Sequence, residues 1–274
     1  MNTLYTFASS NLHISLSAEP IFHIGSFAIT NAMLLGFLGT IVTLVIFFYV
    51  GSKLKKGSTN RFVGLVQWAF EGMLKSVDDV ITDRKLARTI APTAITIFFF
   101  VLINYWLGIL PGIGSITWNG LPLFRSLTAD LNFTFAIAII TMVGVQIYAI
   151  KHHGVFGNAG RYFKNPLKDP IGAFEGVLEF IGEFSRGVSL SLRLFGNAFA
   201  GEVLLLIVGI LTSYFATVTL PIFMAFELFI GFIQAYVFFI LTLIFTSLAQ
   251  ESHAGDPSSD HSPAASAKKA TQLE

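Results

Sequence analysis

The sequence predicts an all-α integral membrane protein with five membrane helices and one amphipathic surface helix. Of its 274 residues, 54% are hydrophobic and only 12% are charged, whereas a soluble domain carries about 25% charged residues. The mean hydropathy is +0.71. The net charge of +1 gives no indication of nucleic-acid binding, and the lack of cysteine excludes disulfides and thiolate metal sites.

Five apolar stretches are long enough to cross a bilayer, which takes about 20 helical residues. They lie at about 30–50, 89–110, 131–150, 171–211 and 218–248. Pro92 falls near the start of the second stretch, where a proline is tolerated, and a Gly-rich loop separates the second from the third. The fourth stretch would be roughly 60 Å long as a helix, so we expect it to tilt, bend or begin outside the bilayer.

The remaining segments flank this single membrane domain, which we place at 28–250. Residues 1–27 form an N-terminal segment outside the membrane, and residues 251–274, rich in Ser, Ala, His and Pro, are typical of a disordered tail. Residues 62–83 predict an amphipathic helix on the membrane surface, with Val63, Val66, Phe70 and Leu74 on one stripe. The alternative is a soluble helix that packs on the membrane domain.

The distribution of basic residues predicts the orientation. The loop after the first span, the 151–170 loop and the C-terminal tail together hold 14 of the 17 Lys and Arg. Because basic residues accumulate on the cytoplasmic side, we expect five passes with the N-terminus outside and the C-terminus in the cytoplasm. Arg125 is then the one basic residue on the outer side.

Arg193 is the most informative residue, because it lies within the fourth apolar stretch. A charge at the bilayer centre costs about 2.5–3.5 kcal/mol on insertion scales. Arg186, Ser189, Arg193, Gly196, Asn197 and Ala200 fall along one face of a helix. Small residues let another helix approach closely, so this face predicts a tightly packed partner that uses the charge. The structural alternative is a buried Arg193 paired with a carboxylate of this chain.

Acidic residues occur in two groups along the chain, on either side of Arg193. Glu202 and Glu227, with Asp130 as a third candidate, belong toward the outside, and Glu175, Glu179 and Glu183 toward the cytoplasm. Glu202 points away from Arg193 and therefore needs water, a cation or a proton. Asp130 is better explained as a helix N-cap than as a proton site. The alternative for Glu175, Glu179 and Glu183 is a solvated face, with a weak Glu183–Arg186 pair.

An arginine between two acidic groups interrupts a proton relay, because its guanidinium keeps its proton at ordinary pH. Two half-channels separated by a fixed charge would force the proton to cross on a moving partner.

The chain resembles the a subunit of rotary F-type ATP synthases. The resemblance rests on Ser189 to Asn197 followed by Ala200-Gly201-Glu202, on Thr128 to Thr134, on Asn104 to Gly112, and on Gln234-Ala235 with Thr242. These motifs occur in the family's order between about residues 90 and 250, while the first 27 residues and the tail after Gln250 take no part.

The resemblance implies one upright helix, a helical pair, and two long tilted helices that form a hairpin against a ring of c subunits. It further implies a proton-channel stator in a bacterial inner membrane, with lipid and peripheral-stalk b subunits as further partners and no cofactor. By this resemblance Arg193 is the essential arginine, Asn197 and Gln234 lie near it, and Glu202 and Glu227 line the outer half-channel. Glu179 belongs to the inner one, and Asp130 and Asn132 lie at the start of the third span. The sequence has no nucleotide motif such as GxxxxGK[ST], so we expect a conducting subunit without catalysis of its own.

Two other functions are compatible with the residues. A self-contained ion or solute transporter would use Glu202 and Glu227 as its own relay. A scaffold subunit of a respiratory complex would hold its buried charges for structural reasons.

Overall fold

A computed structural model describes residues 17–25, 27–57, 60–113, 116–118, 120–162 and 170–251. Its helices are α2 (Asn31–Lys55), α3 (Arg61–Val80), α4 (Arg84–Ile109), α5 (Leu131–Tyr162), α6 (Pro170–Thr212) and α7 (Ala216–Glu251). Five of them, all but α3, are long and apolar enough to span a membrane within the described residues. The predicted all-α membrane architecture is confirmed. The 251–274 tail falls outside these residues, apart from Glu251.

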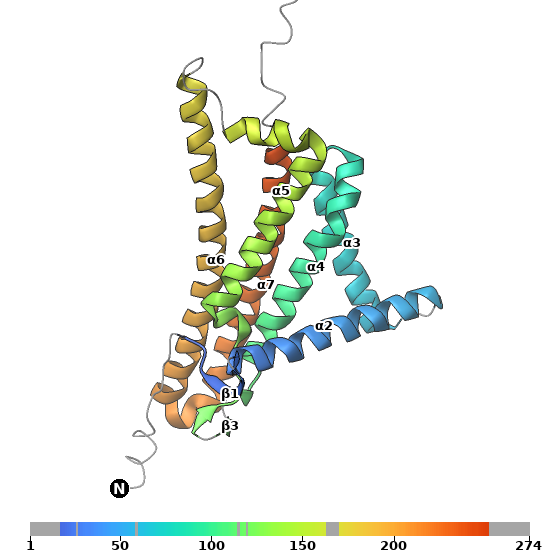
Figure 1. The fold of residues 1–274 in the computed structure, drawn as a ribbon. Helices are drawn as coiled ribbons and strands as arrows, with labels where there is room; N and C mark the ends of the chain where they lie inside the picture. Colours follow the sequence, from blue (N-terminus) through green and yellow to red (C-terminus); the bar gives the residue numbers. More distant parts are fainter. Residues whose placement is uncertain are drawn as a thin grey trace, which may run out of the picture.

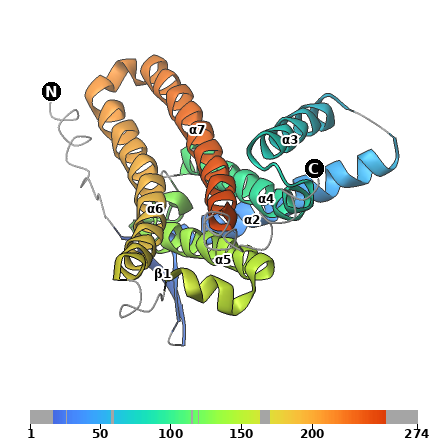
Figure 2. The same ribbon diagram turned by 90° about the horizontal axis from the view of Figure 1, so that it is seen from above.

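The long helices pack into one bundle around an aromatic core. Helix α4 packs on α7, α5 packs on α6, and α6 also packs on α7. Phe98 and Phe239 are fully buried in this core, with their rings at an edge-on angle. Figure 2 shows α6 and α7 side by side, with α2 and α3 on the other side of the bundle. Ser213–Phe215 joins α6 to α7 in a single 3-10 turn, so the two longest helices form a hairpin.

Three helices extend beyond the expected spans, and α2 ends at Lys55 rather than near 50. Helix α4 begins at Arg84 rather than near 89, with Asp83 as a cap that accepts from the Lys85 amide at 2.9 Å. Pro92 therefore lies inside the helix, not near its start. Helix α5 continues past 150 and changes direction at Gly154, whose φ of 75° suits glycine.

Two short antiparallel hairpins, absent from the expected elements, lie near one end of the bundle. Strand β1 (Pro20–Ile24) pairs with β2 (Phe27–Thr30), and β3 (Thr117–Trp118) pairs with β4 (Leu121–Pro122). Figure 1 shows both hairpins beside the start of α2, at the end where α6 joins α7. The described part of the N-terminal segment thus contains a β-hairpin.

Helix α3 has two apolar faces rather than one. Val63, Val66, Met73 and Val77 are buried against the bundle. Phe70 and Leu74, which were expected on the same stripe, border this face and are partly exposed. Phe62, Leu65 and Trp68, spaced by three, form a second apolar stripe that is exposed, with Trp68 76% exposed. An exposed apolar stripe with a Trp is what a helix at the membrane surface would present, and the placement of α3 at that surface stays a prediction.

Candidate functional site

Arg193 lies on an open face of α6. Its side chain is exposed, in a shallow groove that Phe184, Val188 and Leu192 also line. Within the residues that the structure describes, no carboxylate or hydrogen-bond acceptor of this chain contacts the guanidinium. The structural alternative, an ion pair inside the chain, is therefore not found among those residues.

The rest of the predicted stripe is open as well. Ser189, Gly196, Asn197 and Ala200 are all exposed on α6. A Cβ atom built on Gly196 would meet no atom within 4 Å. Arg186, two turns before Arg193, is partly buried instead. The face thus presents one cation among small side chains, with no covering element of its own chain in the described part.

Asn197 and Gln234 join α6 to α7 about one turn from Arg193. The Asn197 side-chain amide donates to the Gln234 Oε1 at 2.8 Å. Gln234 is buried, and its Nε2 has no hydrogen-bond partner among the described residues. The family resemblance implies that Gln234 lies near the arginine, and the structure brings its side chain to Asn197, on the same helix as Arg193.

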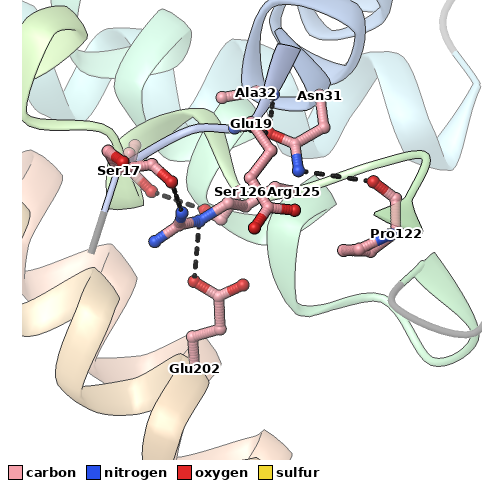
Figure 3. A network of polar contacts seen from close by, with 9 residues as sticks. Ser17, Glu19, Asn31, Ala32, Pro122, Arg125, Ser126 and Glu202 are labelled. Carbon is pink, nitrogen blue, oxygen red and sulfur yellow. Dashed lines mark hydrogen bonds and ion pairs between the residues drawn. The ribbon is translucent and has the colours of Figure 1, made fainter. Parts of the chain in front are cut away.

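Glu202 pairs with a cation that the sequence analysis did not connect to it. The Arg125 Nε lies 3.6 Å from the Glu202 Oε2, with the Glu202 side chain 42% exposed and Arg125 only 7% exposed. The Arg125 Nη1 donates to the Ser17 carbonyl oxygen at 2.6 Å. Figure 3 shows Arg125 between Ser17 and Glu202. The sequence offered two signals for this pair: Arg125 is the one basic residue expected on the outer side, and Glu202 is a glutamate that needs a cation.

Replacing Arg125 by alanine should loosen the attachment of the N-terminal segment. The Arg125–Glu202 contact is partly solvated, so its loss together with the Ser17 contact should cost about 1 kcal/mol. This corresponds to a roughly fivefold larger fraction of molecules in which the N-terminal segment is detached from the bundle. Cleavage after Phe22 of β1 by chymotrypsin should accelerate by that factor in Arg125→Ala membranes and not in Arg61→Ala, an exposed-arginine control. Equal cleavage rates in all three proteins would contradict the anchoring role.

Glu227 is buried between three helices. Its side chain is 4% exposed on α7, and its Oε1 accepts a hydrogen bond from the Tyr105 hydroxyl of α4 at 2.6 Å. A Cβ on Gly201 of α6 would collide with the Glu227 carboxylate. Because Gly201 adjoins Glu202, the two acids come from neighbouring positions on the α6–α7 hairpin. Glu227 and Gln234 are both buried on α7, as their seven-residue spacing predicts.

A second acidic group lies in the first half of α6. Glu179, Glu183 and Arg186 line a small cavity of about 30 Å³, together with Phe245 of α7. This volume is enough for one water molecule. The Arg186 guanidinium lies 5.3 Å from the centre of the Phe245 ring, and its Nε has no hydrogen-bond partner within the described part of the chain.

Glu183 does not lie on a solvated face. The alternative that places Glu175, Glu179 and Glu183 on such a face is therefore wrong for Glu183. Its carboxylate accepts hydrogen bonds from the Gln146 side chain and, at 2.6 Å, from the Tyr162 hydroxyl. Both donors come from α5, and the Glu183 side chain is half-buried between the helices. Glu175, one turn before Glu179, is exposed, as the solvated-face alternative predicts.

Asp130 acts as the N-cap of α5. Its Oδ1 accepts from the Asn132 amide at 2.9 Å, and its carbonyl oxygen accepts from the Thr134 amide at 3.1 Å. Asp130 is buried while the Asn132 side chain is exposed. The capping interpretation of Asp130 is therefore confirmed. Within the described part of the chain, neither Asp130 nor Asn132 hydrogen-bonds or pairs with Glu202 or Glu227.

Comparison with known proteins gives one family. A family model described as ATP synthase A chain matches residues 33–247, from α2 into α7. A subunit named ATP synthase subunit a in Mycobacterium tuberculosis (strain CDC 1551 / Oshkosh) is 32% identical over 230 residues, which cover 81% of this chain and 87% of the relative. A protein named ATP synthase subunit a 2 in Vibrio campbellii is 32% identical over 233 residues, which cover 81% of this chain and 89% of the relative.

Proposed function

Because this chain belongs to the ATP synthase subunit a family, we propose that it is the stator through which protons enter and leave a ring of c subunits. As a family member it is a multi-pass membrane component of a rotary ATP synthase. The finer proposal concerns the route: two offset half-channels that Arg193 separates. The ring, the peripheral-stalk b subunits and the surrounding lipid are the partners in this proposal, with the N-terminus outside and the C-terminus in the cytoplasm.

The exposed Arg193 is the observation that carries the proposal. A guanidinium in an apolar span needs a partner, and the described residues of this chain supply none. A carboxylate on a rotating ring would meet it at the open α6 face, among Ser189, Gly196 and Ala200. At about 4 Å and an effective dielectric of about 20, such an attraction is worth about 4 kcal/mol.

The outer half-channel is assigned to Glu202 and Glu227. Both belong to the α6–α7 hairpin, and Glu202 is partly exposed beside Arg125 and Ser17. The partial exposure of Glu202 supports it as the first group to accept a proton from outside. The burial of Glu227 supports it as the group that takes up the proton in a later step. We assign a supporting role to Asp130 and Asn132. Asp130 caps α5, and Asn132 is exposed at the start of the same helix, next to the outer half-channel.

The inner half-channel is assigned to Glu179. Its support is the cavity that it shares with Glu183 and Arg186, because polar groups and room for one water are what a proton path needs. Between the two half-channels, Asn197 and Gln234 hold α6 against α7 near Arg193.

Rotation follows from the alternation of these sites. A ring carboxylate, neutral while it faces lipid, reaches Arg193 and releases its proton to the inner half-channel. The next carboxylate takes a proton from Glu227 as it leaves the arginine. Each proton that crosses gains about 2.3 kcal/mol per 100 mV of membrane potential. This chain conducts and does not itself catalyse ATP synthesis.

Proton conductance in liposomes separates this proposal from a self-contained transporter. We expect the isolated chain to conduct no better than empty liposomes under a potassium diffusion potential, and co-reconstitution with the c ring to restore conductance. Conductance by the isolated chain that Glu202→Gln abolishes would instead support a transporter with its own glutamate relay.

A further inference from the structure

Tyr105 makes a contact that the proposed proton route does not yet use. Its side chain comes from α4, is only 1% exposed, and donates its hydroxyl hydrogen to the Glu227 Oε1 at 2.6 Å. The two residues are 122 positions apart in the sequence. Among the described residues, no other side chain hydrogen-bonds Glu227. Hydrogen bonds to a carboxylate in a dry environment are short and about twice as strong as neutral ones.

Two glycines make this contact possible. A Cβ on Gly231, one turn after Glu227 on α7, would collide with the Tyr105 ring, and a Cβ on Gly201 of α6 would collide with the Glu227 carboxylate. The ring therefore lies directly against the α7 backbone, and the carboxylate lies directly against the α6 backbone. These two close approaches bring the Tyr105 hydroxyl within reach of the Glu227 carboxylate, and the hydrogen bond between them selects the orientation of the carboxylate.

A tyrosine hydroxyl suits a site that gains and loses a proton. It can donate to an ionised carboxylate and accept from a protonated one. The hydrogen bond therefore persists through both states, with the hydroxyl turning about its C–O bond. Tyr105 keeps its own proton throughout; the transferred proton arrives on the Glu227 carboxylate and leaves from it.

We propose that Tyr105 is a positioning residue that holds the Glu227 carboxylate in one orientation toward α6 throughout the proton cycle. This inference rests on the proposed function, because it requires Glu227 to carry protons. Without the hydroxyl, the carboxylate would take other orientations, and proton transfer through Glu227 would limit the flow.

Tyr105→Phe tests the inference, because it removes the hydroxyl and keeps the ring that packs on Gly231. We would measure passive proton conductance of the membrane sector in vesicles stripped of the catalytic head, in H₂O and in D₂O, per assembled complex. Conductance should fall several-fold and its H₂O/D₂O ratio should rise, since proton transfer at a misplaced carboxylate becomes limiting. The matched control is Tyr148→Phe, which also removes a hydroxyl contact between helices, to Thr93 at 3.1 Å, and should leave both quantities unchanged.

Three results would overturn the positioning role: wild-type conductance in Tyr105→Phe, reduced conductance with an unchanged isotope ratio, or failure of the Tyr105→Phe complex to assemble. The last would mean that the hydroxyl serves stability. Glu227→Gln separates this inference from the function beneath it. If Glu227→Gln conducts normally, the proposed role of Glu227 fails; if it is defective while Tyr105→Phe is normal, only the role of Tyr105 fails.

Discussion

Arg193→Lys should abolish ATP-driven proton pumping although the positive charge is kept. Arginine presents a planar fork of donors and is weakly hydrated, whereas the lysine ammonium is a compact, strongly hydrated point charge. On the open face of α6, only the fork can hold a passing carboxylate in two hydrogen bonds and release it without a tight water shell. Pumping in inverted vesicles, measured as acidification per assembled complex, should fall to the level of vesicles without the complex.

Arg186→Ala is the matched comparison for this experiment. Arg186 lies on the same helix, but its guanidinium is partly buried over the Phe245 ring rather than open to a partner. We therefore expect a much smaller loss than at Arg193, confined to the inner end of the helix. An Arg186 variant as defective as the Arg193 variant, or an Arg193→Lys complex that pumps normally, would contradict the distinction between the two arginines.

Glu202→Gln should slow proton entry by at least about tenfold without blocking assembly. Removal of a positioned proton-transfer group usually costs 10²- to 10⁴-fold, and water at the partly exposed Glu202 can replace part of that function. The amide keeps the size of the side chain but carries no proton for transfer. ATP synthesis driven by an imposed proton gradient, normalised to assembled complex, measures the effect.

Glu175→Gln provides the control for Glu202. It makes the same chemical change on the same helix, at an exposed glutamate outside the assigned route, and should leave synthesis within error of wild type. Normal synthesis in Glu202→Gln would remove Glu202 from the proton path. A similar loss in both variants would point to a general effect of charge on α6.

The sequence predicts best what depends on local pattern. The membrane helices follow from the length of apolar runs, and the cap at Asp130 follows from its position before a long apolar stretch. The open stripe around Arg193 follows from helical spacing. The start of α4 was missed because charged residues such as Arg84 and Lys85 do not look like part of a span, although they continue the helix.

Contacts between distant segments are what the sequence could not supply. Nothing near Tyr105 indicates that its hydroxyl reaches Glu227, because that contact depends on how α4 crosses α7 at Gly231. The Arg125–Glu202 pair likewise depends on a loop that turns back over α6. One interpretation of the sequence places Glu183 on a solvated face, because its donors Gln146 and Tyr162 lie on another helix.

The most direct test of the central claim is ATP-driven proton pumping in inverted vesicles that carry Arg193→Ala, with assembly of the complex verified in the same membranes. If Arg193 separates the half-channels and couples ion flow to rotation, the assembled variant complex will hydrolyse ATP without acidifying the vesicles. Retained acidification would contradict the account, reduce Arg193 to a structural arginine, and return a self-contained transporter to consideration.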